Sequence, residues 1–145
     1  MGIELEGFIT RGPISIEPDA PALAALDLMI DHGIRHLPVV DESKQICGVV
    51  SFDDLRETLP VPVSLMKPIA ADTRPQVLDV SVRDAMTPDP VTIRSDAPLE
   101  EAVSRMLQGR FGCLPILDDA GRLEAIVTET DLLRALATAL WSSDD

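Results

Sequence analysis

The sequence GVVSFDDL occupies residues 48–55, and a second version of it, AIVTETDL, occupies residues 125–132. In both, an apolar run typical of a β-strand is followed by residues that open a helix. Each run ends in a hydroxyl residue, Ser or Thr, and an Asp stands three positions later. The pattern predicts a polar strand–helix junction in each of two copies.

One constant offset relates the two copies. Asp54 and Asp131 are 131 − 54 = 77 positions apart, and the same offset carries residues 13–59 onto residues 90–136 without a gap. We interpret the chain as one unit duplicated, with a candidate polar site at the junction of each copy.

Each copy is predicted to contain the elements β-α-β-β-α. In the first copy these are a strand at 13–16, a helix from Pro21 to a stop at Gly33, strands at 34–40 and 46–50, and a helix at 51–59. In the second they are a strand at 90–93, a helix from Pro98, strands at 111–117 and 123–127, and a helix at 128–141. Pro38 predicts a sheet edge or an irregularity in its strand.

The predicted fold class is α/β (α+β), with two pseudo-twofold-related β-α-β-β-α units packed into one module. We expect a first domain at 5–59, a connector at 60–80 and a second domain at 81–140. One copy alone is too small to bury its own apolar face, so the two copies are expected to pack face to face. Their junctions would then lie at opposite ends of a shared cleft.

Charge and composition exclude several classes of function. The net charge of −13 disfavours nucleic acids and anionic membrane surfaces. Aromatic residues make up only 3% of the chain, which leaves no stacking platform for single strands. No apolar run approaches the length of a membrane span. Cys47 and Cys113 lie in no metal-type cluster and are expected to be reduced, in a soluble cytoplasmic protein without a metal site.

Several motifs together resemble a known family. Leu-Pro recurs at 37–38 and 114–115, each copy carries [Ser/Thr]-x-x-Asp, and residues 84–93 read DAMTPDPVTI. With the order β-α-β-β-α, these features resemble tandem CBS (cystathionine β-synthase) domains over roughly residues 5–140. The resemblance implies a Bateman module, a regulatory pair that binds adenosyl compounds such as AMP, ADP, ATP, S-adenosylmethionine or NADH in the inter-domain cleft. It implies no catalysis and no required cofactor, and such modules often form homodimers.

The resemblance also implies which residues bind the ligand. The junction aspartate would accept both ribose hydroxyls, and hydroxyl residues and nearby N–H groups would bind ribose or phosphate. The site expected to bind nucleotide better consists of Asp131, Thr128, Thr130, Thr10, Pro13, Ile14, Ile34, Arg35 and His36. The weaker site consists of Asp54, Ser51, Met86, Pro90, Val91, Phe111, Gly112 and Cys113.

The ranking of the two sites depends on the residue before each aspartate. Thr130 offers a hydroxyl, whereas Asp53 places a second carboxylate beside Asp54 and disfavours a phosphate unless Mg²⁺ or an arginine intervenes. The Asp54 site is therefore expected to be empty, metal-assisted or suited to a neutral or cationic adenosyl ligand. Arg35 is a candidate phosphate partner, or alternatively a solvated charge at a strand end.

Two alternatives to ligand binding remain open. A hydroxyl at the N-cap with an acid three residues later is itself a helix-capping arrangement, although Glu and Gln reach the N-cap backbone more easily than Asp. The chain could also be a structural CBS module that serves only dimerisation. No Ser/His/Asp or Cys/His constellation supports an enzyme.

Overall fold

The computed structural model describes residues 5–59, 79–109 and 111–142. They form two compact units, Ile14–Asp89 and the pair of segments Met1–Pro13 and Pro90–Asp145. We call these the middle unit and the terminal unit. Most of the predicted connector lies outside the described residues, and the predicted domain boundaries stay a prediction.

The middle unit is a small sheet with helices. Its elements are α1 (Ala22–His32), β2 (His36–Val40), β3 (Ile46–Ser51), α2 (Phe52–Thr58), α4 (Val82–Ala85) and β4 (Thr87–Pro88). The strand order is β2-β3-β4, so β2, which contains Pro38, is an edge strand with a register shift between Val39 and Val40. The sheet-edge reading of Pro38 is therefore confirmed, whereas Pro38 itself pairs in register with Val49 and the irregularity follows Val39.

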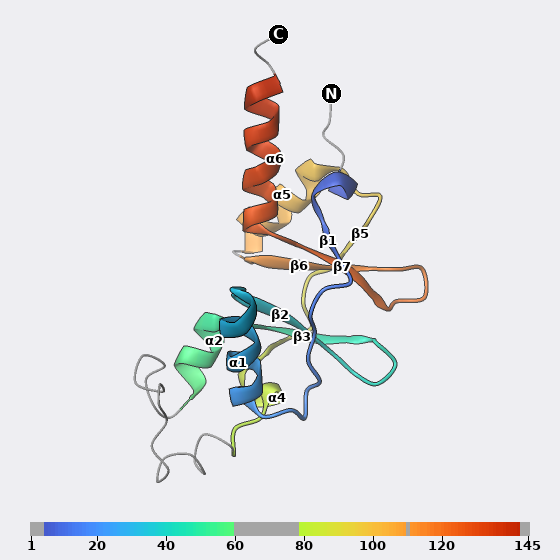
Figure 1. Ribbon diagram of the computed structural model, residues 1–145. Helices are drawn as coiled ribbons and strands as arrows, with labels where there is room; N and C mark the ends of the chain where they lie inside the picture. The colour runs from blue at the N-terminus through green and yellow to red at the C-terminus, as the bar shows by residue number, and fades with distance from the viewer. Residues whose placement is uncertain (1–4, 60–78, 110, 143–145) are drawn as a thin grey trace. The chain divides into compact units, whose positions relative to one another are not determined.

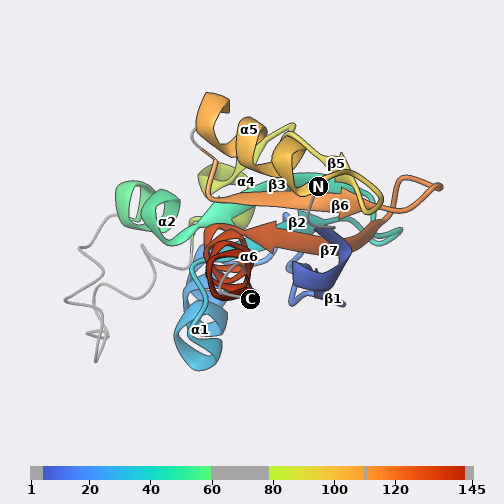
Figure 2. The ribbon, with the colours of Figure 1, turned by 90° about the horizontal axis from the view of Figure 1, so that it is seen from above.

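The terminal unit combines both ends of the chain. Its elements are η1 (Leu5–Phe8), β1 (Thr10–Arg11), β5 (Ile93–Arg94), α5 (Leu99–Gly109), β6 (Cys113–Leu117), β7 (Leu123–Thr128) and α6 (Glu129–Ser142). The strand order is β1-β7-β6-β5. Seen from above, α6 is end-on at the arrowhead of β7, and α5 runs beside β6 (Figure 2).

The four expected helices, α1, α2, α5 and α6, and both hairpins follow the sequence-based expectation, with ends shifted by one or two residues, whereas η1 was not expected. Gly33 ends α1 in the left-handed conformation, at φ 64°, and its N–H bonds to the Met29 carbonyl. The predicted strands at 13–16 and 90–93 are wrong in extent. Ile16 makes only an isolated parallel bridge to Val39, and β5 is two residues long. Prolines around both segments remove the N–H donors that a longer ladder needs.

The antiparallel strand pairing of the two hairpins repeats the 77-residue offset. Leu37 pairs with Val50 in the middle unit, and Leu114 pairs with Val127 in the terminal unit. The parallel contact of Ile16 with Val39 corresponds to that of Ile93 with Ile116. Even the register shift recurs, between Ile116 and Leu117. The duplicated sequence therefore specifies one hydrogen-bonding pattern twice.

The lead-in segments are exchanged between the copies. The strand β1, which precedes the first copy, pairs with β7 of the second (Figure 1), and β4, which precedes the second copy, pairs with β3 of the first. Gly48 makes room for β4, since an added Cβ would lie 2.6 Å from the Thr87 carbonyl oxygen. Neither compact unit therefore consists of one continuous sequence repeat.

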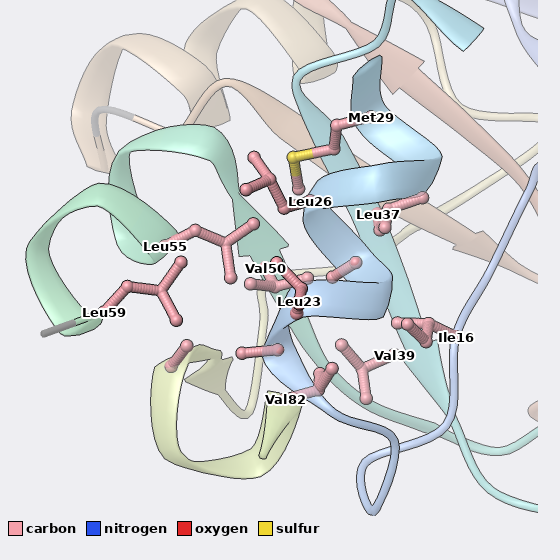
Figure 3. Close-up of a cluster of buried hydrophobic side chains, with 13 residues drawn as sticks. Ile16, Leu23, Leu26, Met29, Leu37, Val39, Val50, Leu55, Leu59 and Val82 are labelled. Atoms are coloured by element: carbon pink, nitrogen blue, oxygen red, sulfur yellow. The ribbon is translucent and has the colours of Figure 1, made fainter. Parts of the chain in front are cut away.

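The core of the middle unit lies between its sheet and helices. Leu55 of α2 and Leu59, which directly follows α2, point toward Leu23 and Leu26 of α1 (Figure 3). All four side chains are at most 7% exposed. At about 25 cal/mol per Å² of apolar surface, each such Leu contributes about 1.5–3 kcal/mol.

The terminal unit leaves more apolar surface uncovered. Its core contains Leu5, Met106, Leu114 and Val127. By contrast, four large side chains of α6 are 53–77% exposed: Leu133, Leu136, Leu140 and Trp141. These four recur at helical spacing, so α6 presents an exposed apolar face.

Candidate ligand-binding site

The Asp131 junction joins β7 to α6. The Thr128 N–H donates to Asp131 Oδ2 at 2.9 Å, and the Thr128 hydroxyl donates to the same oxygen at 3.2 Å. The Asp131 N–H lies 3.4 Å from Thr128 Oγ1. These contacts cap the first turn of α6 and leave Asp131 Oδ1 outside the cap.

Asp131 is the only charged side chain classed as buried within the described parts of the chain, at 2% exposure. Its Oδ1 lies 3.6 Å from Arg134 Nη2, one turn along the helix. The strand register places Cys113 opposite Thr128. Burial, and then the charge of Asp131, raise the pKa of the Cys113 thiol to about 12, so the thiol is neutral at physiological pH.

The Asp54 junction has the same cap and a different environment. The Ser51 N–H donates to Asp54 Oδ2 at 3.0 Å, and the Asp54 N–H donates to Ser51 Oγ at 3.0 Å. Asp54 is only partly buried. The capping contacts of the two junctions are thus nearly alike, whereas their aspartates differ in exposure to solvent.

Charged residues surround the Asp54 junction. Asp53 Oδ1 lies 3.1 Å from Arg56 Nη2 and 3.9 Å from Arg35 Nη2. The Arg35 guanidinium also lies over the Phe52 ring, 4.8 Å from its centroid. An arginine therefore does intervene at Asp53, which weakens the expected repulsion of a phosphate there.

A third Ser-x-x-Asp sequence tests the capping interpretation. At the start of α4 the Ser81 N–H donates to Asp84 Oδ2 at 3.1 Å, and the Ser81 hydroxyl donates to the same oxygen at 3.0 Å. Asp makes the N-cap contact at Asp54, Asp84 and Asp131, so the easier reach of Glu and Gln is no argument against capping here. Capping explains the spacing of all three and leaves the ribose interpretation untested.

The other predicted site residues are distributed over both units. In the better set, Thr10 and Pro13 belong to the terminal unit with Asp131, whereas Ile14, Ile34, Arg35 and His36 belong to the middle unit. In the weaker set, Met86 shares the middle unit with Ser51 and Asp54, whereas Pro90, Val91, Phe111, Gly112 and Cys113 belong to the terminal unit. The structure brings Thr128, Thr130 and Asp131 together at one junction; the complete sets stay a prediction.

Sequence reasoning missed two arginines beside these junctions. Arg56 and Arg134 each lie three residues after an aspartate that they contact, Asp53 and Asp131. Positions three apart on a helix are neighbours, so this spacing was the available signal.

The described residues contain neither a metal-type cluster nor a membrane-spanning helix. No three His, Cys, Asp or Glu side chains there could hold a metal ion together. Within the same residues, no helix combines the length and apolar character that crossing a membrane requires.

Comparison with known proteins identifies the duplicated unit. The family model described as "CBS domain" matches residues 5–61 and again residues 82–138. A CBS domain-containing protein of Dictyostelium discoideum is 31% identical over 141 residues, which cover 97% of this chain and 95% of that protein. The solved structure of CBSX2 in complex with AMP is similar with a TM-score of 0.75 and 28% identity, over 95% of this chain and 98% of that one. CBSX2 is a protein of Arabidopsis thaliana.

Some relatives are much longer enzymes. Inosine-5'-monophosphate dehydrogenase of Methanocaldococcus jannaschii is 31% identical over 126 residues, 87% of this chain but 22% of the enzyme. The chain therefore spans about a fifth of that relative. Together with the repeated strand pairing, these matches confirm the resemblance: the chain belongs to the CBS domain family, as a tandem pair of CBS domains.

Proposed function

We propose that the chain is a regulatory module that senses an adenosyl compound of the AMP, ADP or ATP class, with Asp131 as the ribose acceptor. The buried Asp131 carboxylate carries this proposal. Its cap uses Oδ2, and a carboxylate has about four acceptor positions, so capacity for hydroxyl donors remains. A similar CBS pair, CBSX2, has been solved with AMP, which supports this ligand class.

Burial now gives the main reason to rank Asp131 above Asp54. The expected repulsion by Asp53 is reduced by Arg35 and Arg56. Solvent, however, screens a partly exposed carboxylate more than a buried one, and a hydrogen bond is stronger where the local dielectric is low. The same ranking therefore rests on the 2% exposure of Asp131 as well as on Thr130.

Regulation requires that the ligand bind one arrangement of the protein better than another. In this proposal the chain performs no catalysis, and adenosyl binding alters its contacts with a protein target or a second copy. A homodimer in the cytoplasm stays the prediction, and Mg²⁺ would assist only a phosphate-rich ligand.

A thermal-shift panel tests the proposal. AMP, ADP, ATP with and without Mg²⁺, S-adenosylmethionine and NADH are each added to the full chain. A ligand at 100 times its Kd stabilises the folded state by about 2.7 kcal/mol, which raises Tm by a few degrees. The absence of a shift with every compound would reject adenosyl sensing.

The exposed apolar face of α6 favours a second candidate function, a structural module that dimerises without a ligand. Its occupant would be a second copy of this chain, seated on Leu133, Leu136, Leu140 and Trp141. A concentration-dependent dimer in sedimentation that Leu140→Asp disrupts, together with a null thermal-shift panel, would support it over sensing.

A further inference from the structure

We propose that Asp53 is a positioning residue that controls how readily Arg35 contacts a ligand phosphate, and that Arg56 tunes this control. The inference rests on the proposed function, because it treats Arg35 as part of the nucleotide site. It adds two residues, Asp53 and Arg56, that act on the ligand only through Arg35.

One carboxylate oxygen is shared by two cations. Asp53 Oδ1 lies closer to Arg56 Nη2, at 3.1 Å, than to Arg35 Nη2, at 3.9 Å. The Arg35 guanidinium lies over the Phe52 ring, 4.8 Å from its centroid, and the Phe52 N–H donates to the Arg35 carbonyl at 2.8 Å. The guanidinium of Arg35 is thus held at the junction, while its ion pair with Asp53 is long.

Exposure makes this ion pair easy to exchange. The side chains of Arg35, Asp53 and Arg56 are 65%, 61% and 60% exposed. Ion pairs this exposed are weak, whereas arginine binds phosphate through short charge-assisted bonds with bidentate geometry. A phosphate can therefore replace Asp53 as the partner of Arg35, with Asp53 as the internal competitor.

Arg56 weakens that competition. Because it takes the shorter contact to Asp53 Oδ1, it neutralises part of the charge that would otherwise hold Arg35. Arg35 and Arg56 together balance the two carboxylates at the junction, Asp53 and Asp54. Without Arg56, the ion pair between Asp53 and Arg35 would be stronger. A phosphate would then bind Arg35 more weakly.

The other copy lacks this arrangement. The 77-residue offset carries Arg35, Asp53 and Arg56 onto Gly112, Thr130 and Leu133. None of these counterparts is charged, so the three equivalent positions of the second copy cannot share a carboxylate in this way.

The test compares AMP with adenosine, which differ by the phosphate, in calorimetric titrations of the full chain. The measured quantity is the ratio of the two affinities. Asp53→Asn should raise the preference for AMP by about two- to fivefold, the worth of an exposed ion pair. Arg56→Gln should lower it by a similar factor, and Arg35→Gln should lower it by about tenfold.

A double variant separates positioning from direct repulsion. If Asp53 acts through Arg35, Asp53→Asn adds nothing in the Arg35→Gln background. A gain that persists there would mean that Asp53 repels the phosphate directly, and the inference would be wrong. Asp53→Glu, which keeps the charge, should keep the wild-type ratio.

Asp96→Asn is the matched control. Asp96 is a 70% exposed carboxylate that pairs with Arg94 at 3.1 Å in the terminal unit, and its removal should leave the ratio unchanged. If the wild type binds both compounds but Asp53→Asn has no effect on the ratio, the inference alone fails. If the wild type binds neither compound, both the proposed function and the inference that rests on it are wrong.

Discussion

The two strand–helix junctions share their backbone contacts and differ in everything around them. The Ser51 and Thr128 N–H groups donate to Asp54 and Asp131 at 3.0 and 2.9 Å. Asp131 is buried beside the neutral Cys113 thiol, whereas Asp54 is partly exposed among charges that include Asp53. Duplication has therefore preserved the hydrogen bonds that build the fold, while burial and charge have diverged.

The helices that follow the junctions show the same divergence. Leu59 and Leu136 are related by the offset, yet Leu59 is 6% exposed and Leu136 is 53% exposed. Leu59 leaves the helix with extended backbone and is followed in sequence by Pro60, which disfavours a helical residue before it. Leu136 is followed by Ala137, and α6 continues to Ser142. Leu59 therefore leaves its helix and packs in the core, whereas Leu136 remains within α6.

Truncating these two leucines should give the largest difference between the copies. Leu59→Ala removes a core side chain and should lower the free energy of unfolding by about 2–5 kcal/mol. Leu136→Ala should change it by about 0.5 kcal/mol or less. Urea denaturation followed by circular dichroism measures both. Equal losses would show that Leu136 is covered in solution.

Removing the two aspartates should separate the copies by ligand affinity. Asp131→Ala should weaken AMP binding by about 10–100-fold, since hydrogen bonds to a charged group contribute about 1.5–3 kcal/mol. Asp54→Ala should weaken it by less than about threefold. Calorimetry measures both, and equal losses would reverse the ranking. Asp131→Asn, which keeps an acceptor for the Thr128 N–H, controls for loss of the cap.

The two cysteines should respond differently to alkaline pH. The folded pKa of Cys113 is about 12 against an ordinary value of 9.0, so the native state retains the proton that the unfolded chain releases. The stability from this thiol is present below pH 9 and declines as the pH rises toward 12. Between pH 9 and 10.5 the free energy of unfolding should fall by about 1.5 kcal/mol through this group.

The Cys113→Ala variant should lack that part of the decline when urea unfolding is repeated across the pH range. Cys47 provides the comparison, since burial and the charge of Asp41 raise its pKa while the charge of Arg83 opposes the rise. A pH dependence that Cys113→Ala leaves unchanged would show that the thiol is more open to water than its 5% exposure indicates.

Removing the capping hydroxyls should give the smallest effect. Ser51→Ala and Thr128→Ala should each lower stability by about 0.5–2 kcal/mol. Thr128→Ala belongs at the lower end, because the bond from the Asp131 N–H to Thr128 Oγ1 is 3.4 Å, against 3.0 Å for the Ser51 bond. Thermal unfolding of both variants checks the order, and a larger loss at Thr128 would contradict it.

Local sequence patterns predicted the four longer helices, the hairpins and the caps. Helical spacing of apolar residues, the glycine stop at Gly33 and the polar turns act over a few residues and are visible without tertiary information. The exchange of β1 and β4 was not predicted, because two-residue strands carry almost no periodic signal. The contact of Arg35 with Phe52 was missed for a related reason, since it joins residues far apart in sequence.

The sequence by itself determined the duplication, its gapless register and the residues that cap each second helix. A constant offset forces equivalent hydrogen bonds, and short-range chemistry selects the helix starts. Only the tertiary structure decided that Asp131 is buried, that Arg35 shares Asp53 with Arg56 and that α6 exposes an apolar face. Burial and charge neighbourhood depend on which surfaces meet after the chain folds, and equivalent residues in a duplicated sequence need not meet equivalent surfaces.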